Sequence, residues 1–367
     1  MDIRIAKNEI LRGLYLTYGI ADRKSTIPIL ANVLVRTVGT DKVLFAATDL
    51  KVAMMVTAKA TVDEEGGITV GARQLYEIVK GMGGEEVRLQ RTEQNWLHIT
   101  SGRTEFKVVG MSDRDFPKLP SVEEIACSKV EASLIGEMIA KTLLSVSQDE
   151  TRPHLASVLF ESDGEKSTMV STDGHRLSKV SRSTPRGPKT STGVLLPRKG
   201  LSEIRRALEG NQGSCDIGID QGFFVVKSDD MVLSVKLGEG QFPPYDQVIP
   251  KDNNKKIVLG KDAFLEALRR VSIIASDKTW GIRFSLEKGK LSIEADNPDL
   301  GNAKEGMDVD YKGAALQIGF NARYFIDLLT EMSGKDVSVE LGGDLDPALI
   351  KPCDGSDYLG VVMPMRL

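Results

Sequence analysis

The chain has 367 residues, of which 41% are apolar and 27% are charged, and its net charge is −4. This length and balance are typical of a soluble, folded chain of two or three domains and exclude a disordered protein. The chain contains no run of about 18 apolar residues and no apolar block at its N-terminus, so the usual signals of a membrane span and of a signal peptide are missing.

Three segments predict an amphipathic helix that opens a repeated unit. They cover residues 7–19, 131–144 and 261–274. Each contains an apolar pair, followed one turn later by a third apolar residue, which is the spacing of a buried helical stripe. The positions are Ile10, Leu11 and Leu14, then Leu134, Ile135 and Met138, then Phe264, Leu265 and Leu268.

Three strand-like segments contain an aspartate near their ends. They cover residues 43–50, 167–177 and 290–300, and Asp49, Asp173 and Asp296 are separated by 124 and then 123 residues. An aspartate at a strand end accepts hydrogen bonds from nearby backbone N–H groups. The shared element is therefore predicted to be a turn aspartate.

A second helix is predicted in each unit, over residues 70–82, 196–208 and 320–332. The three segments align without gaps, and their apolar positions recur at helical spacing. A basic residue and an acidic residue also recur, with the acid four residues after the base and close enough to pair with it on one helix face. The aligned positions are Leu75, Leu201 and Phe325; Ile78, Ile204 and Leu328; Arg73, Lys199 and Arg323; and Glu77, Glu203 and Asp327.

Several markers in fixed order, at a period of roughly 125 residues, indicate three tandem copies of one module. Proline-rich connectors at 115–120 and 241–250 mark the ends of the first two copies, because proline continues neither a helix nor a strand ladder. We therefore expect domains at 1–122, 123–250 and 251–367. Between the helices lie many short alternating strands, so the predicted class is α+β with antiparallel sheets covered by helices.

The segment 172–177, TDGHRL, could suggest a catalytic pair of Asp173 and His175 with Ser171 or Ser178 as the nucleophile. A catalytic triad is defined by its geometry, however, and not by adjacency in sequence. The equivalent segments around Asp49 and Asp296 contain no histidine, which favours the turn interpretation. We expect no catalytic residue and no enzymatic activity.

Metal and cofactor signals are missing from the sequence. His98, His154 and His175 have no partner at zinc-ligand spacing, and the three cysteines are far apart and odd in number. The glycine-rich stretches 81–86 and 341–346 match neither a phosphate loop nor a dinucleotide fingerprint. The sequence therefore predicts no metal and no cofactor, and free thiols in a reducing compartment, which favours the cytoplasm.

Lysine and arginine recur on or beside the predicted helices. On one helix they would be read as an ordinary solvated face. In three modules placed along an arc, equivalent helices would add their cations into one field that contacts phosphates without reading sequence. The residues concerned are Arg73, Lys80, Arg198, Lys199, Arg205, Arg206, Arg269, Arg270 and Arg323.

The C-terminal residues 361–367, VVMPMRL, are unusually apolar for a chain end. They could form the last strand of the third sheet. They could equally line an exposed groove, because methionine-rich surfaces suit the binding of short peptides. The residues alone leave both interpretations open.

The ordered set of TDGHRL (172–177), PRKG (197–200), IGFN (318–321), PILANVL (28–34), ATDL (47–50) and the ending VVMPMRL resembles the β subunit of bacterial replicative DNA polymerase, the sliding-clamp family. The resemblance covers the whole chain. It implies three clamp modules with sheets outside and two helices per module inside, joined head to tail as a homodimeric ring around duplex DNA. It also implies a processivity factor for DNA replication, whose partners are the polymerase alpha subunit, the clamp loader and repair polymerases.

The resemblance further implies the roles of individual residues. Clients would insert a short peptide rich in Gln, Leu and Phe between the second and third domains. The matching positions are Leu155, Thr172, Gly174, His175, Arg176, Leu177, Pro243, Val248, Asn321, Tyr324, Val361, Met363, Pro364, Met365 and Arg366. Those that approach DNA are Lys24, Arg73, Arg152, Arg198 and Lys199. Those at the dimer contact are Phe106 and Val108, facing Ile273 and Ile274 of the partner.

Some rim positions depart from the family pattern. Gln247 and Thr279 stand where other members can carry a basic and an aromatic residue, and 342–347 is an acidic version of another rim segment. Two other functions stay open at this point. One is an enzyme that uses Asp173 and His175, and the other is a scaffold that binds peptides but never DNA.

Overall fold

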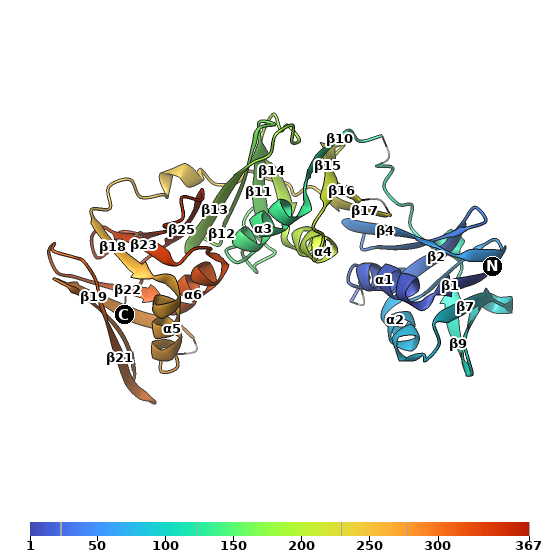
Figure 1. Ribbon diagram of the computed structural model, residues 1–367, viewed down its shortest axis with the longest axis horizontal. Coiled ribbons are helices and arrows are strands. Elements are labelled where there is room, and N and C mark those ends of the chain that lie inside the picture. The colour runs from blue at the N-terminus through green and yellow to red at the C-terminus, as the bar shows by residue number, and fades with distance from the viewer. Residues whose placement is uncertain (23, 123, 229, 277, 367) are drawn as a thin grey trace. The chain divides into compact units, whose positions relative to one another are not determined.

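The structure is a computed structural model that describes residues 1–366 apart from 23, 123, 229 and 277 (Figure 1). The chain forms two compact units. Unit 1 contains 1–136, 186–188 and 199–237, and unit 2 contains 137–185, 189–198 and 238–367. The middle third of the chain thus contributes to both units.

In the described residues, six α-helices occupy the predicted segments. Their bounds are α1 Lys7–Tyr18, α2 Ala72–Gly81, α3 Ala132–Leu143, α4 Arg198–Leu208, α5 Lys261–Ser272 and α6 Ala322–Glu331. The prediction of two helices per copy is confirmed. Most of the aligned apolar positions are buried, including Leu75, Leu201 and Phe325, whereas Ile78 is only half-buried.

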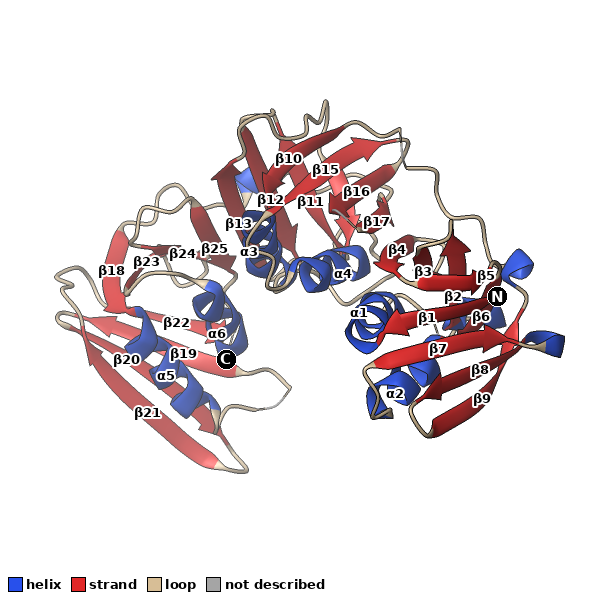
Figure 2. Cartoon of the chain, turned by 45° about the vertical axis from the view of Figure 1, so that its right-hand side comes forward, coloured by secondary structure: helices blue, strands red, loops and turns tan. Residues whose placement is uncertain are grey.

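Unit 1 is built on a 13-stranded antiparallel sheet whose order is β10-β15-β16-β17-β4-β3-β2-β6-β9-β8-β7-β1-β5. Its strands are β1 Asp2–Ala6, β2 Asn32–Val38, β3 Lys42–Thr48, β4 Val52–Lys59, β5 Thr61–Glu64, β6 Gly67–Gly71, β7 Glu86–Arg91, β8 Trp96–Ser101, β9 Thr104–Met111, β10 Cys127–Glu131, β15 Ser214–Asp220, β16 Phe223–Ser228 and β17 Met231–Lys236. Helices α1 and α2 pack against each other and on this sheet (Figure 2).

Unit 2 contains an 8-stranded sheet in the order β14-β11-β12-β13-β25-β24-β23-β18 and a 4-stranded sheet in the order β21-β20-β19-β22. The strands are β11 Ser157–Ser162, β12 Lys166–Thr172, β13 Arg176–Ser183, β14 Val194–Pro197, β18 Lys255–Gly260, β19 Gly281–Glu287, β20 Lys290–Asn297, β21 Gly301–Asp308, β22 Leu316–Asn321, β23 Asp336–Leu341, β24 Ala348–Pro352 and β25 Tyr358–Val362. Helices α5 and α6 pack together here.

Strands from different copies pair within each unit. In unit 1, β17 of the second copy pairs with β4 of the first, and Val235 lies opposite Val52. In unit 2, β25 of the third copy pairs with β13 of the second, and Val362 lies opposite Arg176. We call these two pairings the first and second junctions. They join successive copies through continuous sheets, so neighbouring copies share a sheet.

Each unit buries an apolar core between its helices and its strands. In unit 2 the core contains four phenylalanines whose ring centroids lie 5.1 to 6.2 Å apart in the tilted and edge-on arrangements that aromatic pairs favour. They are Phe264 on α5, Phe284 on β19, Phe320 on β22 and Phe325 on α6. Burying one such ring stabilises the fold by about 2 to 3 kcal/mol, so this cluster holds both helices to the sheet.

The turn aspartate is confirmed in two copies and corrected in the third. Asp49 and Asp173 each follow a strand and accept two backbone N–H groups through Oδ1. Asp296, by contrast, lies inside β20, which runs to Asn297, and Asn297 Oδ1 accepts the Asp299 amide at 3.0 Å. Asn297 is therefore the structural equivalent of the two aspartates, because β20 continues one residue further than expected.

No helix in the described part of the chain is both long and apolar enough to cross a membrane.

Candidate functional site

The turn between β12 and β13 is fixed by its own side chains. The Thr172 hydroxyl donates to the Arg176 carbonyl at 2.7 Å and accepts the Gly174 amide at 3.1 Å. Asp173 Oδ1 accepts the amides of His175 and Arg176. Gly174 has φ +91°, a conformation that residues with a Cβ rarely adopt. The turn is thus a rigid platform that leaves Gly174 and His175 exposed.

Arg176 connects this turn to helix α6. Its Nε donates to Asp173 Oδ2 at 3.1 Å, and its Nη1 donates to Asp327 Oδ2 at 2.6 Å. The guanidinium also lies 4.6 Å from the ring centroid of Tyr324. The Arg176 side chain is only 11% exposed, so these contacts are made in a largely dry environment where charge-assisted bonds are strong.

The C-terminal segment lies beside the same turn. The Met363 amide donates to the His175 carbonyl at 2.9 Å, and the Met365 amide donates to the Gly319 carbonyl at 2.9 Å. The segment therefore continues past β25 as a tethered chain end. The strand interpretation of the C-terminus is confirmed for residues 361–362, which complete β25, and the groove interpretation stays a prediction for residues 363–366.

The remaining predicted site residues divide by exposure. Val248 is 42% exposed and Met363 is 36% exposed, so both present apolar surface to solvent. Leu155, Leu177 and Val361 are buried, so in the predicted peptide groove they could line the bottom but not the exposed edge. The half-buried ones are Pro243, Asn321, Tyr324, Pro364 and Met365, and Arg366 is exposed.

Asp327 is a residue of this site that sequence reasoning assigned elsewhere. It was identified as the acid that pairs with Arg323 one turn earlier, but it pairs instead with Arg176. The same expectation is wrong for the second copy, where Glu203 pairs with Arg206 and Lys199 pairs with Asp49. Asp327 and Lys199 thus each pair with a residue from another element, whereas Glu203 pairs with a different residue of its own helix.

The segment 242–249 also borders the candidate site. The Tyr245 hydroxyl donates to Glu161 Oε2 at 2.9 Å, and Lys179 Nζ lies 5.0 Å from the Tyr245 ring centroid. Burial, together with the hydrogen bond to Glu161, raises the pKa of Tyr245, so this phenol stays protonated. Phe242 and Ile249 pack on the same apolar cluster as Leu177 and Val361.

The predicted catalytic alternative has no supporting geometry. Asp173 is used by the turn and by Arg176, as described above. The Ser171 hydroxyl donates to the Thr142 carbonyl at 2.6 Å, and the Ser178 hydroxyl is 2.8 Å from that of Ser145. Both serines are buried and satisfied inside the sheet–helix layer. Among the described residues, no group of three or more His, Cys, Asp or Glu side chains could hold a metal ion.

The cations predicted to approach DNA are not equivalent. Lys24, Arg73 and Arg152 are exposed, and Arg152 Nε lies 3.6 Å from Asp149. Arg198 is half-buried. Lys199 Nζ lies 2.5 Å from Asp49 Oδ2, and the Asp49 side chain is only 8% exposed. The positive charge of Lys199 is therefore largely neutralised by Asp49 inside unit 1.

The residues predicted at the dimer contact also differ in availability. Phe106 is 39% exposed and Ile273 is 74% exposed, so each offers apolar surface. Ile274 is half-buried. Val108 is 6% exposed and belongs to the core cluster of unit 1. Because its side chain points between the sheet and the helices of its own unit, Val108 can offer a partner its backbone but little side-chain surface.

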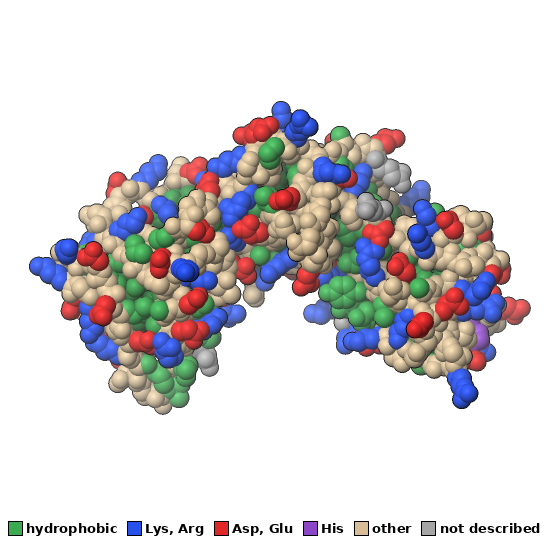
Figure 3. Space-filling model, viewed as in Figure 1, with side chains coloured by type: hydrophobic (Ala, Val, Ile, Leu, Met, Phe, Trp, Pro, Cys, Tyr) green, Lys and Arg blue, Asp and Glu red, His purple; other side chains and the backbone are tan. Residues whose placement is uncertain are grey.

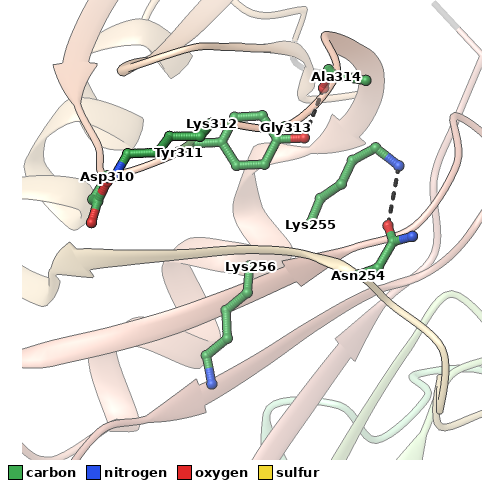
Figure 4. Close-up of a pocket in the computed structure, with 8 residues that line it drawn as sticks. All are labelled: Asn254, Lys255, Lys256, Asp310, Tyr311, Lys312, Gly313 and Ala314. Atoms are coloured by element: carbon green, nitrogen blue, oxygen red, sulfur yellow. Dashed lines mark hydrogen bonds and ion pairs between the residues drawn. The ribbon is translucent and has the colours of Figure 1, made fainter.

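A polar hollow of about 570 Å³ lies elsewhere in unit 2, between the start of β18 and residues 310–314 (Figure 4). It is lined by Lys255, Lys256, Lys312 and Asp310, and the Tyr311 hydroxyl donates to the Ala314 carbonyl at 2.7 Å. Its lining does not suit an apolar peptide. On the face seen in Figure 3, basic and acidic side chains are mixed, and no single sign of charge covers that face.

Three domain families cover nearly the whole chain. The N-terminal domain of the DNA polymerase III beta subunit matches residues 1–120, the central domain matches 129–244, and the C-terminal domain matches 246–366. The chain belongs to the DNA polymerase III beta subunit family. The family resemblance and the fold class, α+β with three clamp modules, are confirmed. The domain limits at 122 and 250 stay a prediction.

Relatives and solved structures agree with this family over full length. The beta sliding clamp of Pseudomonas putida is 33% identical, and that of Escherichia coli K12 is 31% identical, with all of each chain covered. The DNA polymerase III subunit beta of Pseudomonas aeruginosa superposes with a TM-score of 0.93 at 31% identity. The sliding clamp of Bartonella birtlesii, solved bound to griselimycin, superposes with a TM-score of 0.94 at 31% identity. Both structures and this chain are completely covered. These relatives are named sliding clamps and are not enzymes, which confirms the expectation of no enzymatic activity.

Proposed function

We propose that two copies of this chain close head to tail into a ring around duplex DNA, and that the site around Arg176 tethers the replicative polymerase. The ring converts a weak protein–DNA interaction into lasting attachment, because a closed ring cannot leave duplex DNA sideways. Processivity then comes from topology and not from affinity.

This proposal rests on a strand pairing that joins successive copies and is left open at both ends of the three-copy chain. Two junctions are made within the chain, by β4 with β17 and by β13 with β25. A third equivalent pair is left open, since β21 ends its sheet and residues 104–109 of β9 pair only with β8 in the described structure. An open strand edge at each end of the repeat is a template for pairing with a second copy. Two such pairings would close the assembly by symmetry.

The client site is proposed from its apolar and charged parts. Val248 and Met363 supply exposed apolar surface for Leu or Phe side chains, and Met363 can adapt its shape to different peptides. Arg176, held by Asp173 and Asp327, supplies a fixed donor beside them. One site would therefore accept short peptides from the polymerase alpha subunit, the clamp loader and repair polymerases in turn.

DNA contact is proposed to be weak and independent of sequence. The exposed cations Lys24, Arg73 and Arg152 would approach phosphates, partly through water, so that the ring slides without a sequence-dependent barrier. Opening a junction would need an external loader. We place this work in the cytoplasm, where free cysteines persist.

The test uses a nicked circular plasmid, the clamp loader and ATP. The loaded protein should co-elute with the circle through gel filtration in high salt and should be released when a restriction enzyme linearises the DNA. Equal retention on circular and linear DNA would contradict encirclement. A chain that stays monomeric and is never retained would support the peptide-binding scaffold instead.

A further inference from the structure

The strand that opens each copy has different neighbours in the first and third copies. In the first copy, β1 lies between β7 and β5. In the third copy, β18 ends its sheet and, among the described residues, pairs only with β23. The outer backbone N–H and C=O groups of β18 are therefore open, and such an edge is a template for an added strand. What this edge accepts is a separate question from the proposed function and does not depend on the client site.

β1 and β18 are equivalent strands. Each runs directly into the first helix of its copy, α1 or α5. Each also pairs antiparallel with the strand that follows the second helix. In the first copy Ala6 lies opposite Glu86. In the third copy Gly260 lies opposite Asp336. The first copy can therefore show what a strand at this position accepts on its outer side.

The outer edge of β1 is covered by an acidic strand of the same chain. β5 pairs antiparallel with β1, and Thr61 lies opposite Arg4. The Arg4 guanidinium donates two hydrogen bonds of 3.0 Å to the carboxylate of Asp63. Such two-pronged contacts between a guanidinium and a carboxylate are strong and specific. At this position of the repeat, an edge strand thus accepts the extended acidic segment TVDEE (61–65).

The equivalent segment of the third copy does not cover β18. Counted from the second helix, residues 61–64 correspond to 311–314. Tyr311 is only 7% exposed, its carbonyl accepts the Gly289 amide at 2.9 Å, and its hydroxyl donates to the Ala314 carbonyl, so the segment is anchored to its own sheet. The hollow of about 570 Å³ lies between this segment and the start of β18 (Figure 4). A water molecule needs only about 15 Å³ of such space, so the two segments are not packed together.

The lining of this hollow favours an acidic occupant. It contains three lysines and one aspartate. Lys255 Nζ donates to the neutral Gly342 carbonyl at 2.8 Å, and this contact leaves its charge uncompensated. Lys256 and Lys312 are 60% and 88% exposed, and each lies 3.6 Å from a carboxylate oxygen. Exposed ion pairs at that separation are weak, so these lysines can exchange them for a better placed acid.

We propose that the open edge of β18 binds an extended acidic segment of a partner protein, which adds as an antiparallel strand in the way that β5 adds to β1. Val258, which corresponds to Arg4 and is 51% exposed, contacts an apolar residue of that segment. Lys255, Lys256 and Lys312 pair with the acidic residues that follow the apolar one. Main-chain hydrogen bonds supply affinity, and the lysines supply specificity.

The test uses the sequence of β5 as its probe. A fluorescein-labelled peptide ATVDEEG, the sequence of residues 60–66, is titrated into the full-length protein, in which β5 already occupies β1. Fluorescence anisotropy should show saturable binding. The amide peptide ATVNQQG has nearly the same shape without the charges and should bind at least about fivefold more weakly. Equal affinity for the two peptides would contradict recognition of an acidic segment.

Variants of the protein locate the peptide. Lys256→Gln combined with Lys312→Gln should weaken binding of ATVDEEG by about fivefold, and the fold should be kept because both side chains are exposed. Lys129→Gln, on the edge strand β10 that opens the second copy, is the matched control and should leave the affinity unchanged. The reverse pattern would place the peptide on β10 and overturn the proposal.

Hydrogen–deuterium exchange separates strand addition from a simple anion site. Exchange of the amides of residues 255–260 should slow when ATVDEEG is bound, because an added strand occupies open backbone groups. Unchanged exchange there, or displacement of the peptide by inorganic phosphate at equal concentration, would contradict strand addition. Displacement by a Gln-, Leu- and Phe-containing peptide would place the probe in the client site and also overturn the proposal. Failure of that client peptide to bind anywhere would instead count against the proposed function alone.

Discussion

Arg176, the first residue of β13, and Asp327 on helix α6 form an ion pair with Nη1 and Oδ2 2.6 Å apart. The same guanidinium lies over Tyr324 and donates to Asp173. One arginine thus connects the second and third copies at the place where we expect clients to dock.

Replacing Arg176 with alanine is expected to weaken binding of a Gln-, Leu- and Phe-containing client peptide by at least about tenfold. It should also lower the free energy of unfolding by about 2 kcal/mol, because two carboxylates lose a charged donor. Fluorescence anisotropy with a labelled peptide and urea unfolding measure the two effects. Arg283→Ala, on the exposed face of β19, is the matched control and should change neither. Unchanged affinity in Arg176→Ala would remove this residue from the client site.

Deletion of residues 363–367 should abolish peptide binding and leave the dimer intact. Val361 and Val362 remain in β25, so the strand and its pairing with β13 are kept. The deletion removes the contacts to His175 and Gly319, and none of the described residues 363–366 has a fully buried side chain. Sedimentation and peptide anisotropy check the two halves of this prediction. Loss of the dimer in this variant would mean that the client site and the dimer contact have been confused.

Cations near the proposed DNA path should separate into two classes. Substituting Lys24, Arg73 and Arg152 together with alanine should reduce the salt dependence of DNA binding, since each exposed cation contributes to counterion release. Lys199→Ala should instead leave that slope nearly unchanged and lower the stability of the fold by about 1 kcal/mol, because its main partner is the buried carboxylate of Asp49. Salt titrations of DNA binding and urea unfolding distinguish the classes, and a large change of slope in Lys199→Ala would reverse the assignment.

Ile273→Asp is expected to convert the dimer to a folded monomer. Ile273 is 74% exposed at the end of α5, so a charge there costs little in the isolated chain but would be buried in the proposed contact. Val258→Asp, on an exposed strand position of the same unit, serves as the control and should stay dimeric. A dimeric Ile273→Asp protein would place the contact elsewhere.

The three thiols should react differently. Cys127 and Cys353 are exposed, whereas Cys215 is buried and burial raises its pKa to about 11. A group with a raised pKa stays protonated below that value, so Cys215 should remain an unreactive thiol at pH 8 and still at pH 10. A maleimide should therefore modify two thiols in the native protein and three in urea, as counted by mass spectrometry. Rapid native labelling of Cys215 would show that strands β10 and β15 open readily.

The sequence predicted the positions of helices and strands more accurately than it predicted which strands pair with each other. Helical spacing located all six described helices, because a buried stripe depends on local sequence alone. It could not show that β4 pairs with β17, since alternation marks a strand but not its neighbour. Val108 was assigned to the dimer contact through the family resemblance, and this assignment stays a prediction, although the Val108 side chain packs into the core of its own unit.

The candidate site was predictable only in part. The residues of 172–177 and the C-terminus were identified through the family resemblance, and the structure brings both segments together. The role of Asp327 was missed because helical spacing suggested Arg323 as its partner. Ion pairs between elements depend on the packing of whole strands and helices, which no local pattern specifies.

The most direct measurement of the central claim is an image of the purified particle by electron microscopy. The account predicts a closed ring of two chains with a central hole wide enough for duplex DNA. Single chains, or two chains joined at one junction only with no hole, would contradict it.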